Sequence, residues 1–275
     1  MPEGDTIHRT ARRLRPALAG HQLTRFEAPR LVGDRPKVGG TIQAVEAVGK
    51  HLLIRFDDAL VLHTHMKMAG SWHVYRTNER WREAKHLARA VVGVEDWVAV
   101  CFAAPIVSTF RDLPGTQSPI AHLGPDLCLD DVDIDAVLDR LASLPEPDAE
   151  IADALLDQRV AAGIGNVFKS ETLWANRTSP FLRLGSVDTD LRHRLWATAS
   201  RQLRANLGGG PRTTVPGGLA VYGRNRQPCL RCGTNVEMVE HGTHARLTYW
   251  CPTCQPAPQP EQRLDAPSGG LPPTG

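Results

Sequence analysis

Four cysteines near the C-terminus constrain the fold of this 275-residue chain more than any other feature. They form the pattern C-x2-C-x18-C-x2-C, in which each pair can turn two thiolates toward one metal ion. The residues between the pairs predict a β-hairpin, with strands at 236–239 and 246–250 and a turn at 241–242. Since four thiolates leave no open coordination position, the pattern predicts a structural Zn²⁺ site whose ligands are Cys229, Cys232, Cys251 and Cys254.

A disulfide framework is the alternative interpretation of such a cysteine-rich segment. The first residues are polar and lead into an arginine-rich stretch, whereas a secretion signal would need an apolar run there. We therefore expect a cytoplasmic protein with reduced thiols, which favours zinc. No apolar run approaches the length of a transmembrane helix, so no membrane partner is expected. Cys101 and Cys128 are interpreted as ordinary buried cysteines.

Hydrophobic periodicity divides the rest of the chain into a β-rich half and a helical half. Residues 5–18 predict an amphipathic helix, with Asp5 as a cap and Gly20 as a stop. Short β-like segments follow at 23–28, 41–48, 52–56, 60–65, 72–75, 88–94, 97–103 and 106–110. Such closely spaced strands predict a sandwich or barrel.

The composition becomes acidic and proline-rich near residue 129, which indicates a linker containing a short helix at 134–141. Helices are then predicted at 151–158, 166–176 and 187–207, with a glycine-containing turn at 161–165. The expected fold is a multidomain α+β protein. Its parts are an N-terminal β-sandwich domain with an N-terminal helix (1–128), a linker (129–148), a helical domain (149–222), the zinc finger (223–256) and a disordered tail (257–275).

The charge of the chain is compatible with a nucleic-acid partner but does not require one. The formal net charge is +2 and the pI about 8.3. Arginines crowd the first predicted helix at 9–15 and the approach to the cysteines at 224–231. Solvated helix faces explain either cluster equally well.

Four motifs, in order along the chain, resemble those of the Fpg/Nei family of DNA glycosylases, which includes formamidopyrimidine-DNA glycosylase and endonuclease VIII. They are Pro2-Glu3-Gly4-Asp5, the sequence GKHLL at 49–53, the sequence GIGNVFKSE at 163–171, and the zinc finger. Each motif alone is weak, but their joint occurrence over residues 1–255 is specific. The resemblance implies an N-terminal β-sandwich joined to a helix-two-turn-helix domain with a zinc finger, which agrees with the division above.

The resemblance implies that Pro2, Glu3 and Lys50 are catalytic. Removal of Met1 would expose a secondary amine whose pKa, about 8 for a free α-amine, would fall further at a helix N-terminus. This amine would attack C1′ of a damaged nucleotide and form an imine, from which the strand phosphates are eliminated. Glu3 would serve as general acid/base, and Lys50 would contact phosphate or assist departure of the base. Taken singly, these residues have plainer interpretations: helix initiation, a first-turn charge and an exposed turn lysine.

Asn166, Arg246 and Met68 are the DNA contacts that the resemblance implies. Asn166 opens a helix after a glycine turn, a geometry that binds anions, although an asparagine cap explains it as well. Arg246 would hold the phosphates at the lesion with its planar guanidinium. Met68 would fill the gap that the flipped base leaves. Without the resemblance, Met66 and Met68 would both be interpreted as core residues.

Two departures from the formamidopyrimidine branch favour the endonuclease VIII branch, with actinobacterial proteins as the best match. Residues 102–110 lack the arginine of the void-filling loop, and 213–222 is too short for the loop that covers flipped 8-oxoguanine. The family often has a second acidic residue near Thr6, which is missing here. The implied function is base excision repair, by a bifunctional DNA glycosylase and AP lyase that removes oxidised pyrimidines and cleaves by β,δ-elimination. It would act as a nucleoid-associated monomer on damaged duplex DNA, with bubble or single-stranded DNA left open.

Two alternatives are kept. An 8-oxoguanine or formamidopyrimidine glycosylase of the same family is disfavoured by the two loops. A non-catalytic zinc-ribbon module would bind nucleic acid in a salt-sensitive manner without a covalent intermediate. That second alternative leaves Pro2 and Glu3 unexplained.

Overall fold

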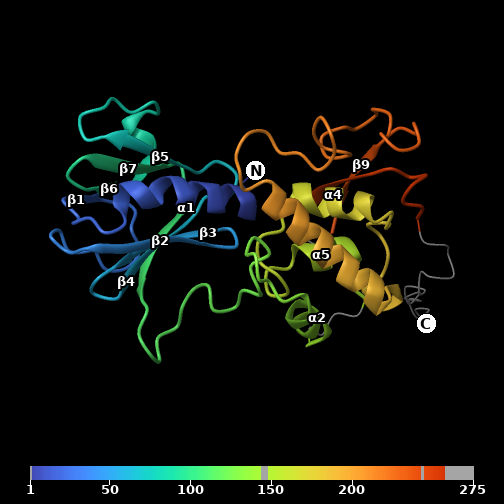
Figure 1. Cartoon of the computed structure of the whole chain (residues 1–275), viewed down its shortest axis with the longest axis horizontal. Helices are drawn as coiled ribbons and strands as arrows, with labels where there is room; N and C mark the ends of the chain where they lie inside the picture. Colours follow the sequence, from blue (N-terminus) through green and yellow to red (C-terminus); the bar gives the residue numbers. More distant parts are fainter. Residues whose placement is uncertain (1, 144–147, 243–244, 258–275) are drawn as a thin grey trace, which may run out of the picture.

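Helix α1 (Gly4–Leu18) runs along the first of two lobes in the computed structural model, which describes residues 2–143, 148–242 and 245–257 (Figure 1). Its apolar side chains recur at helical spacing, and Ile7, Leu14 and Leu18 are buried against strands of both sheets of that lobe. The predicted helix is confirmed. Its N-terminus points at the boundary between the lobes, where the chain begins.

The first lobe is a sandwich of two four-stranded antiparallel sheets, as predicted. Their orders are β1-β6-β7-β5 and β2-β3-β4-β8. The shared core alternates along the strands, with Ile54 and Leu62 from one sheet facing Val92 and Cys101 from the other. The strands are β1 (Arg25–Glu27), β2 (Ile42–Val48), β3 (His51–Phe56), β4 (Leu60–His65), β5 (Ser71–Arg76), β6 (Ala88–Gly93), β7 (Trp97–Phe102) and β8 (Ile106–Arg111), with a 3-10 turn η1 (Lys85–Leu87) before β6.

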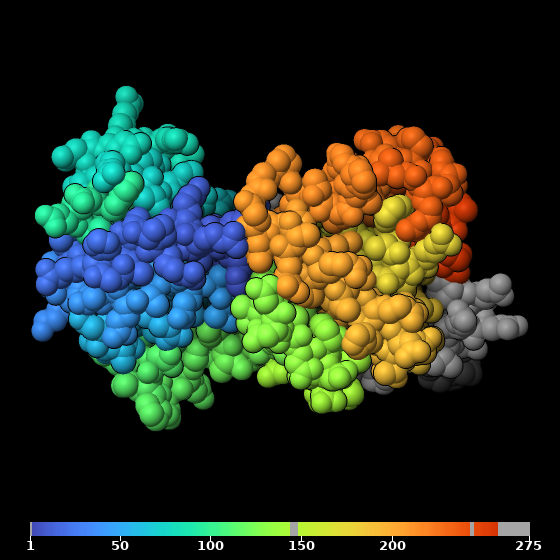
Figure 2. Space-filling view, viewed as in Figure 1, coloured from blue at the N-terminus to red at the C-terminus, as the bar shows by residue number. Residues whose placement is uncertain are grey.

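The second lobe is helical, and both lobes stand out in the space-filling view (Figure 2). Its helices are α2 (Ile134–Ser143), α3 (Ile151–Leu156), α4 (Asn166–Ala175) and α5 (Thr189–Ala205), with a 3-10 turn η2 (Leu184–Ser186) before α5. Phe168 and Trp196 centre their common core. Val137 and Leu141 of α2 pack into the same core, although α2 lies within the predicted linker. The division at residues 128 and 149 remains a prediction.

The zinc finger contains a hairpin of two strands, β9 (Glu237–His241) and β10 (Arg246–Trp250). Strand β10 packs against α4. His241 pairs with Arg246, so β9 includes the first residue of the turn predicted at 241–242, and Gly242 follows the strand as a turn residue. Helix α3 also ends two residues earlier than predicted, because the Asp157 carboxylate accepts the Arg159 N–H and starts a turn. The predicted disordered tail lies, except for residue 257, outside the described residues. Within the described ranges, no helix is long and apolar enough to cross a membrane.

Candidate active site

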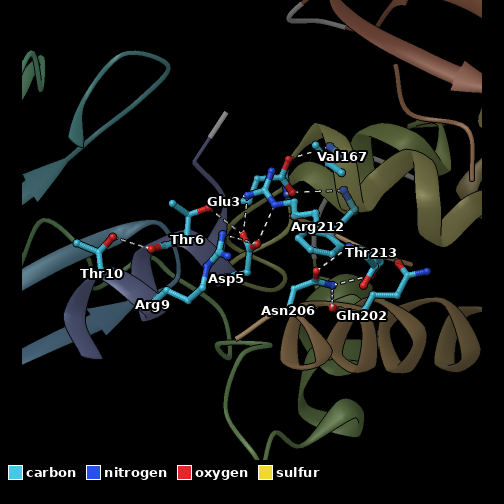
Figure 3. A network of polar contacts seen from close by, with 12 residues as sticks. Glu3, Asp5, Thr6, Arg9, Thr10, Val167, Gln202, Asn206, Arg212 and Thr213 are labelled. Carbon is cyan, nitrogen blue, oxygen red and sulfur yellow. Dashed lines mark hydrogen bonds and ion pairs between the residues drawn. The ribbon is translucent and has the colours of Figure 1, made fainter. Parts of the chain in front are cut away.

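Glu3 joins the two lobes at the N-terminus of the chain. Its carboxylate is fully buried and accepts hydrogen bonds from the backbone N–H groups of Gly165 (2.9 Å), Val167 (2.8 Å) and Phe168 (3.3 Å) (Figure 3). These groups lie at the start of α4, where N–H groups have no partner within the helix. The positive end of the helix dipole also favours a carboxylate there. Glu3 of the first lobe therefore caps a helix of the second.

Gly165 leaves the space that Glu3 occupies. A Cβ at position 165 would lie 2.6 Å from Glu3 Oε1 and closer still to Cγ and Cδ. The φ angle of Gly165 is −121°, an ordinary value for any residue, so the backbone conformation does not require glycine. The close approach of Glu3 is the physical reason for glycine at position 165, the third residue of the GIGNVFKSE motif.

Opposing influences act on the pKa of Glu3. Burial raises it, while the charges of Arg212 and Lys50 and the hydrogen bonds from Val167 and Phe168 lower it. Burial has the largest effect, so the pKa of Glu3 is raised on balance, which suits a carboxyl group that both takes up and releases protons during a reaction.

Lys50 reaches the same place from the turn between β2 and β3. The N–H of Gly49 donates to Asp126 Oδ2 (2.7 Å), and the same oxygen bonds His8 Nε2 of α1 (2.8 Å). Gly49 has a positive φ of 56°, and a Cβ there would lie 2.7 Å from the Cβ of Ala162. The turn is thus pressed against the second lobe. Burial lowers the pKa of Lys50 to about 8, against the opposing influence of Glu3.

A cleft of about 230 Å³ collects most of the predicted site residues. Its wall is formed by Pro2, Lys50, His65, Lys67, Met68, Leu156, Gln158, Gly165, Asn166 and Arg246. Glu3 lies behind this wall, bonded to Gly165. Two hollows are larger, at about 1140 and 520 Å³, but neither contains Pro2 or Lys50. Of these three hollows, the smallest alone has Pro2 beside a lysine of lowered pKa, which makes it the candidate active site.

Met66 and Met68 have opposite environments. Met66 is 2% exposed and packs in the sandwich core, whereas Met68 is 65% exposed and faces the cleft. The interpretation of both as core residues is therefore wrong for Met68. An exposed, flexible apolar side chain beside the cleft fits the wedge that the resemblance implies.

Asn166 and Lys169 connect α4 to the zinc finger. The amide nitrogen of Asn166 donates to the Leu247 carbonyl of β10. Lys169 is 1% exposed, and its ammonium donates to Thr248 Oγ1 at 2.7 Å. Burial lowers the pKa of Lys169 to about 8. These bonds fix the strand that carries Arg246 relative to the glycine turn.

Several residues of the site escaped the sequence patterns. His65 lies in the cleft wall, and His51 behind it bonds His63 with 2.7 Å between Nδ1 and Nε2. Burial lowers the pKa of His51 to about 3 and that of His65 to about 4, so both rings are neutral at physiological pH. His65 stands three residues before the expected DNA contact Met68, and that proximity is its one signal in the sequence. Arg212 had no signal in any motif.

The four cysteines of the finger are arranged for one metal ion. Their sulfur atoms lie within 4.8 Å of one another, with 4.0 Å from Cys229 to Cys254 and 3.4 Å from Cys232 to Cys251. A tetrahedral zinc site with Zn–S bonds of about 2.3 Å separates its sulfurs by about 3.8 Å. The Trp174 indole and the Arg231 N–H donate to Cys229 Sγ, as thiolate ligands require. The residues fit Zn²⁺, which would hold the finger together and take no part in catalysis.

Three protein-family models together match almost all of the described chain. Residues 1–105 match the formamidopyrimidine-DNA glycosylase N-terminal domain, residues 123–215 its H2TH domain, and residues 226–257 the zinc finger found in FPG and IleRS. The chain belongs to the Fpg/Nei family of DNA glycosylases. The predicted resemblance, fold class and zinc finger are confirmed.

Relatives of this Fpg/Nei chain carry endonuclease 8 names. It is 42% identical to "Probable endonuclease 8 2" of Streptomyces coelicolor, covering 96% of this chain and 98% of the relative. It is 38% identical to "DNA-(apurinic or apyrimidinic site) lyase Nei2" of Mycolicibacterium smegmatis, covering 94% of this chain and all of the relative. Endonuclease 8 of Escherichia coli is 31% identical, with 93% of this chain and all of the relative covered.

Solved structures of similar fold are complexes with damaged DNA. MutM bound to DNA that contains carbocyclic 8-oxo-G superposes on the Fpg/Nei chain with a TM-score of 0.77 at 21% identity. Lactococcus lactis Fpg bound to abasic-site DNA has a TM-score of 0.78 at 20% identity. Each covers 93% of this chain and all of the solved one. At this identity the likeness establishes the fold.

Proposed function

We propose that this Fpg/Nei protein is a bifunctional DNA glycosylase and AP lyase of base excision repair that removes oxidised pyrimidines. The observation that carries the proposal is the cleft in which Pro2 and Lys50 of one lobe meet Asn166 and Arg246 of the other, with Glu3 bonded behind them. A strand entering between the lobes meets a nucleophile on one side and phosphate contacts on the other.

Pro2 is the proposed nucleophile, once Met1 has been removed. It lies two residues before Gly4, the first residue of α1, where the helix dipole lowers the pKa of an amine and keeps part of it unprotonated. The amine nitrogen attacks C1′ and the glycosidic bond breaks, so the base leaves with its bonding electrons and takes up a proton. The C1′–O4′ bond then opens as O4′ takes the proton that the amine loses, which leaves an iminium at C1′. The resulting iminium acidifies the C2′ proton, and its removal expels the 3′ phosphate. A second elimination expels the 5′ phosphate, and water then releases the amine.

The remaining cleft residues support these steps. Glu3 moves protons at the sugar ring. The ammonium of Lys50, Asn166 at the start of α4 and the guanidinium of Arg246 hold the phosphates beside the lesion. Met68, exposed at the cleft, fills the space left in the duplex.

Two features of the chain support a pyrimidine substrate over 8-oxoguanine. Strands β7 and β8 are joined by residues 103–105 alone, so no long arginine-bearing loop projects there. The 213–222 segment is held close to α4, since the buried Glu171 carboxylate accepts the N–H groups of Ala220, Val221 and Tyr222. We infer that neither segment covers a flipped purine. We further propose that the protein acts as a monomer on duplex DNA in the cytoplasm, at the nucleoid.

Borohydride trapping tests the proposal, because the reagent reduces an imine to a stable covalent link. Purified protein, with removal of Met1 verified by mass spectrometry, is incubated with duplexes containing dihydrouracil or 8-oxoguanine, beside a Pro2→Gly variant. We expect a covalent adduct and strand cleavage with dihydrouracil, and little of either with 8-oxoguanine. Trapping mainly on 8-oxoguanine would overturn the substrate, and trapping on neither would favour a binding module.

A further inference from the structure

Arg212 links the two lobes through a buried ion pair with Asp5. Its Nε and Nη2 atoms donate to the two carboxylate oxygens of Asp5, at 2.7 and 2.6 Å (Figure 3). Nη2 also donates to Thr6 Oγ1 at 2.8 Å. The Asp5 side chain is fully buried and that of Arg212 is 13% exposed. The pair is bidentate and joins the first turn of α1 to the loop after α5, 207 residues away.

The loop that carries Arg212 is itself fixed at the next residue. Asn206, at the end of α5, accepts the N–H of Thr213 (2.9 Å) and donates to its carbonyl (2.8 Å). The Thr214 hydroxyl bonds the buried carboxylate of Glu171 on α4. The guanidinium therefore projects from a backbone that is held on both α4 and α5.

We propose that Arg212 is a positioning residue for the catalytic N-terminus: by clamping Asp5 and Thr6 against the second lobe, it sets where Pro2 stands in the cleft and where Glu3 stands behind it. The proposal rests on the proposed function, because Pro2 and Glu3 are the groups it positions. Asp5 directly follows Gly4, whose N–H donates to the Gly163 carbonyl at 2.9 Å. Two anchors, one from the glycine turn and one from Arg212, thus hold consecutive residues of the first turn.

Arg212 also acts on Glu3 electrostatically. The other titratable groups that face Glu3 come from different elements: Lys50, Lys169, Tyr222 and Cys128. After burial, which raises the pKa of Glu3, the charge of Arg212 has the largest effect and lowers it. Removal of that charge therefore raises the pKa of Glu3, an effect that loss of packing alone does not have.

The test uses the full-length protein and a duplex with a preformed abasic site. Single-turnover cleavage is measured from pH 5 to 9.5 for wild type, Arg212→Gln and Arg212→Lys. Arg204→Gln, which removes an exposed ion pair with Asp130, is the matched control. We expect Arg212→Gln to cleave at least about tenfold more slowly at saturating enzyme, with its affinity for DNA nearly unchanged. In the pH profile of Arg212→Gln, the change in rate that reports the titration of Glu3 occurs at higher pH than in wild type. In Arg212→Lys it returns toward the wild-type pH.

A second readout does not depend on activity. The titration of Glu3 is followed by carbon NMR in glutamate-labelled protein, with Glu3→Gln to identify its signal. A higher pKa in Arg212→Gln and a wild-type value in Arg204→Gln are expected. If Arg212→Gln matches wild type in rate and titration, or if all variants lose rate without a change in pH profile, the positioning role is wrong. If wild type fails to cleave or to be trapped while the NMR shift persists, the proposed function fails and the coupling of Arg212 to Glu3 stands.

Discussion

A methyl group added at Gly165 should disable the enzyme through Glu3 alone. The new Cβ would lie 2.6 Å from Glu3 Oε1, whereas atoms in contact are ordinarily about 3.5 Å apart. The carboxylate must therefore retreat by about 1 Å, away from the N–H groups of Val167 and Phe168 that it caps. A displacement of this size at a catalytic group costs about 100-fold in rate. Forcing a methyl group into the packed interface costs about 1–3 kcal/mol of stability.

The assay combines single-turnover cleavage of abasic-site DNA with urea denaturation of Gly165→Ala. Gly208→Ala is the matched control, because a Cβ there has no atom within 4 Å and both properties should stay at wild-type values. The double variant Glu3→Gln/Gly165→Ala should cleave no more slowly than Glu3→Gln, since both changes act through one side chain. A folded Gly165→Ala protein that cleaves within twofold of wild type would refute the reasoning.

Four further predictions concern the cleft, the sandwich core beside it and the finger. Lys50, whose pKa is about 8, loses its positive charge as the pH rises through 8. Fluorescence anisotropy should therefore show that the affinity of wild type for abasic-site DNA declines above pH 8. Lys50→Arg should retain its affinity at pH 9.5, because arginine stays charged. An equal decline in both would contradict this. Met66→Ala should destabilise the protein by about 2–5 kcal/mol, because Met66 is in the core. Met68→Ala should change stability by less than about 0.5 kcal/mol yet slow base excision from duplex DNA more than cleavage at a preformed abasic site; equal slowing of both steps would exclude the wedge. Cys232→Ser should release zinc to a chromogenic chelator and weaken DNA binding at least about tenfold, and a variant that keeps its zinc would show that the site is not four-coordinate by cysteine.

The regular elements were predictable because their signals are local. Ile7, Leu14 and Leu18 repeat at helical spacing, and that repeat alone places them on the buried face of α1. The turn of the finger begins one residue later than predicted because His241 pairs with Arg246 across the hairpin, and polar residues leave such a register open.

The part of the site whose residues stand in family motifs could be predicted from the sequence. Pro2, Lys50 and Asn166 stand in recognisable segments, and the fold brings them to one cleft. The Asp5–Arg212 pair has no such signal, since an ion pair between residues 207 positions apart leaves no periodicity in the sequence. The exposure of Met68 likewise depends on the turn after β4 and not on residue type.

The capping of α4 by Glu3 has a consequence for the evolution and engineering of this protein. Glu3, the proposed general acid/base, is held by hydrogen bonds from the other lobe, so neither lobe carries the whole proposed site by itself. A recombination event that exchanges one lobe between relatives succeeds only if the incoming glycine turn accommodates the resident glutamate. The lobe boundary is thus a poor crossover point despite its exposed connection, and the two halves are bound to evolve as one unit.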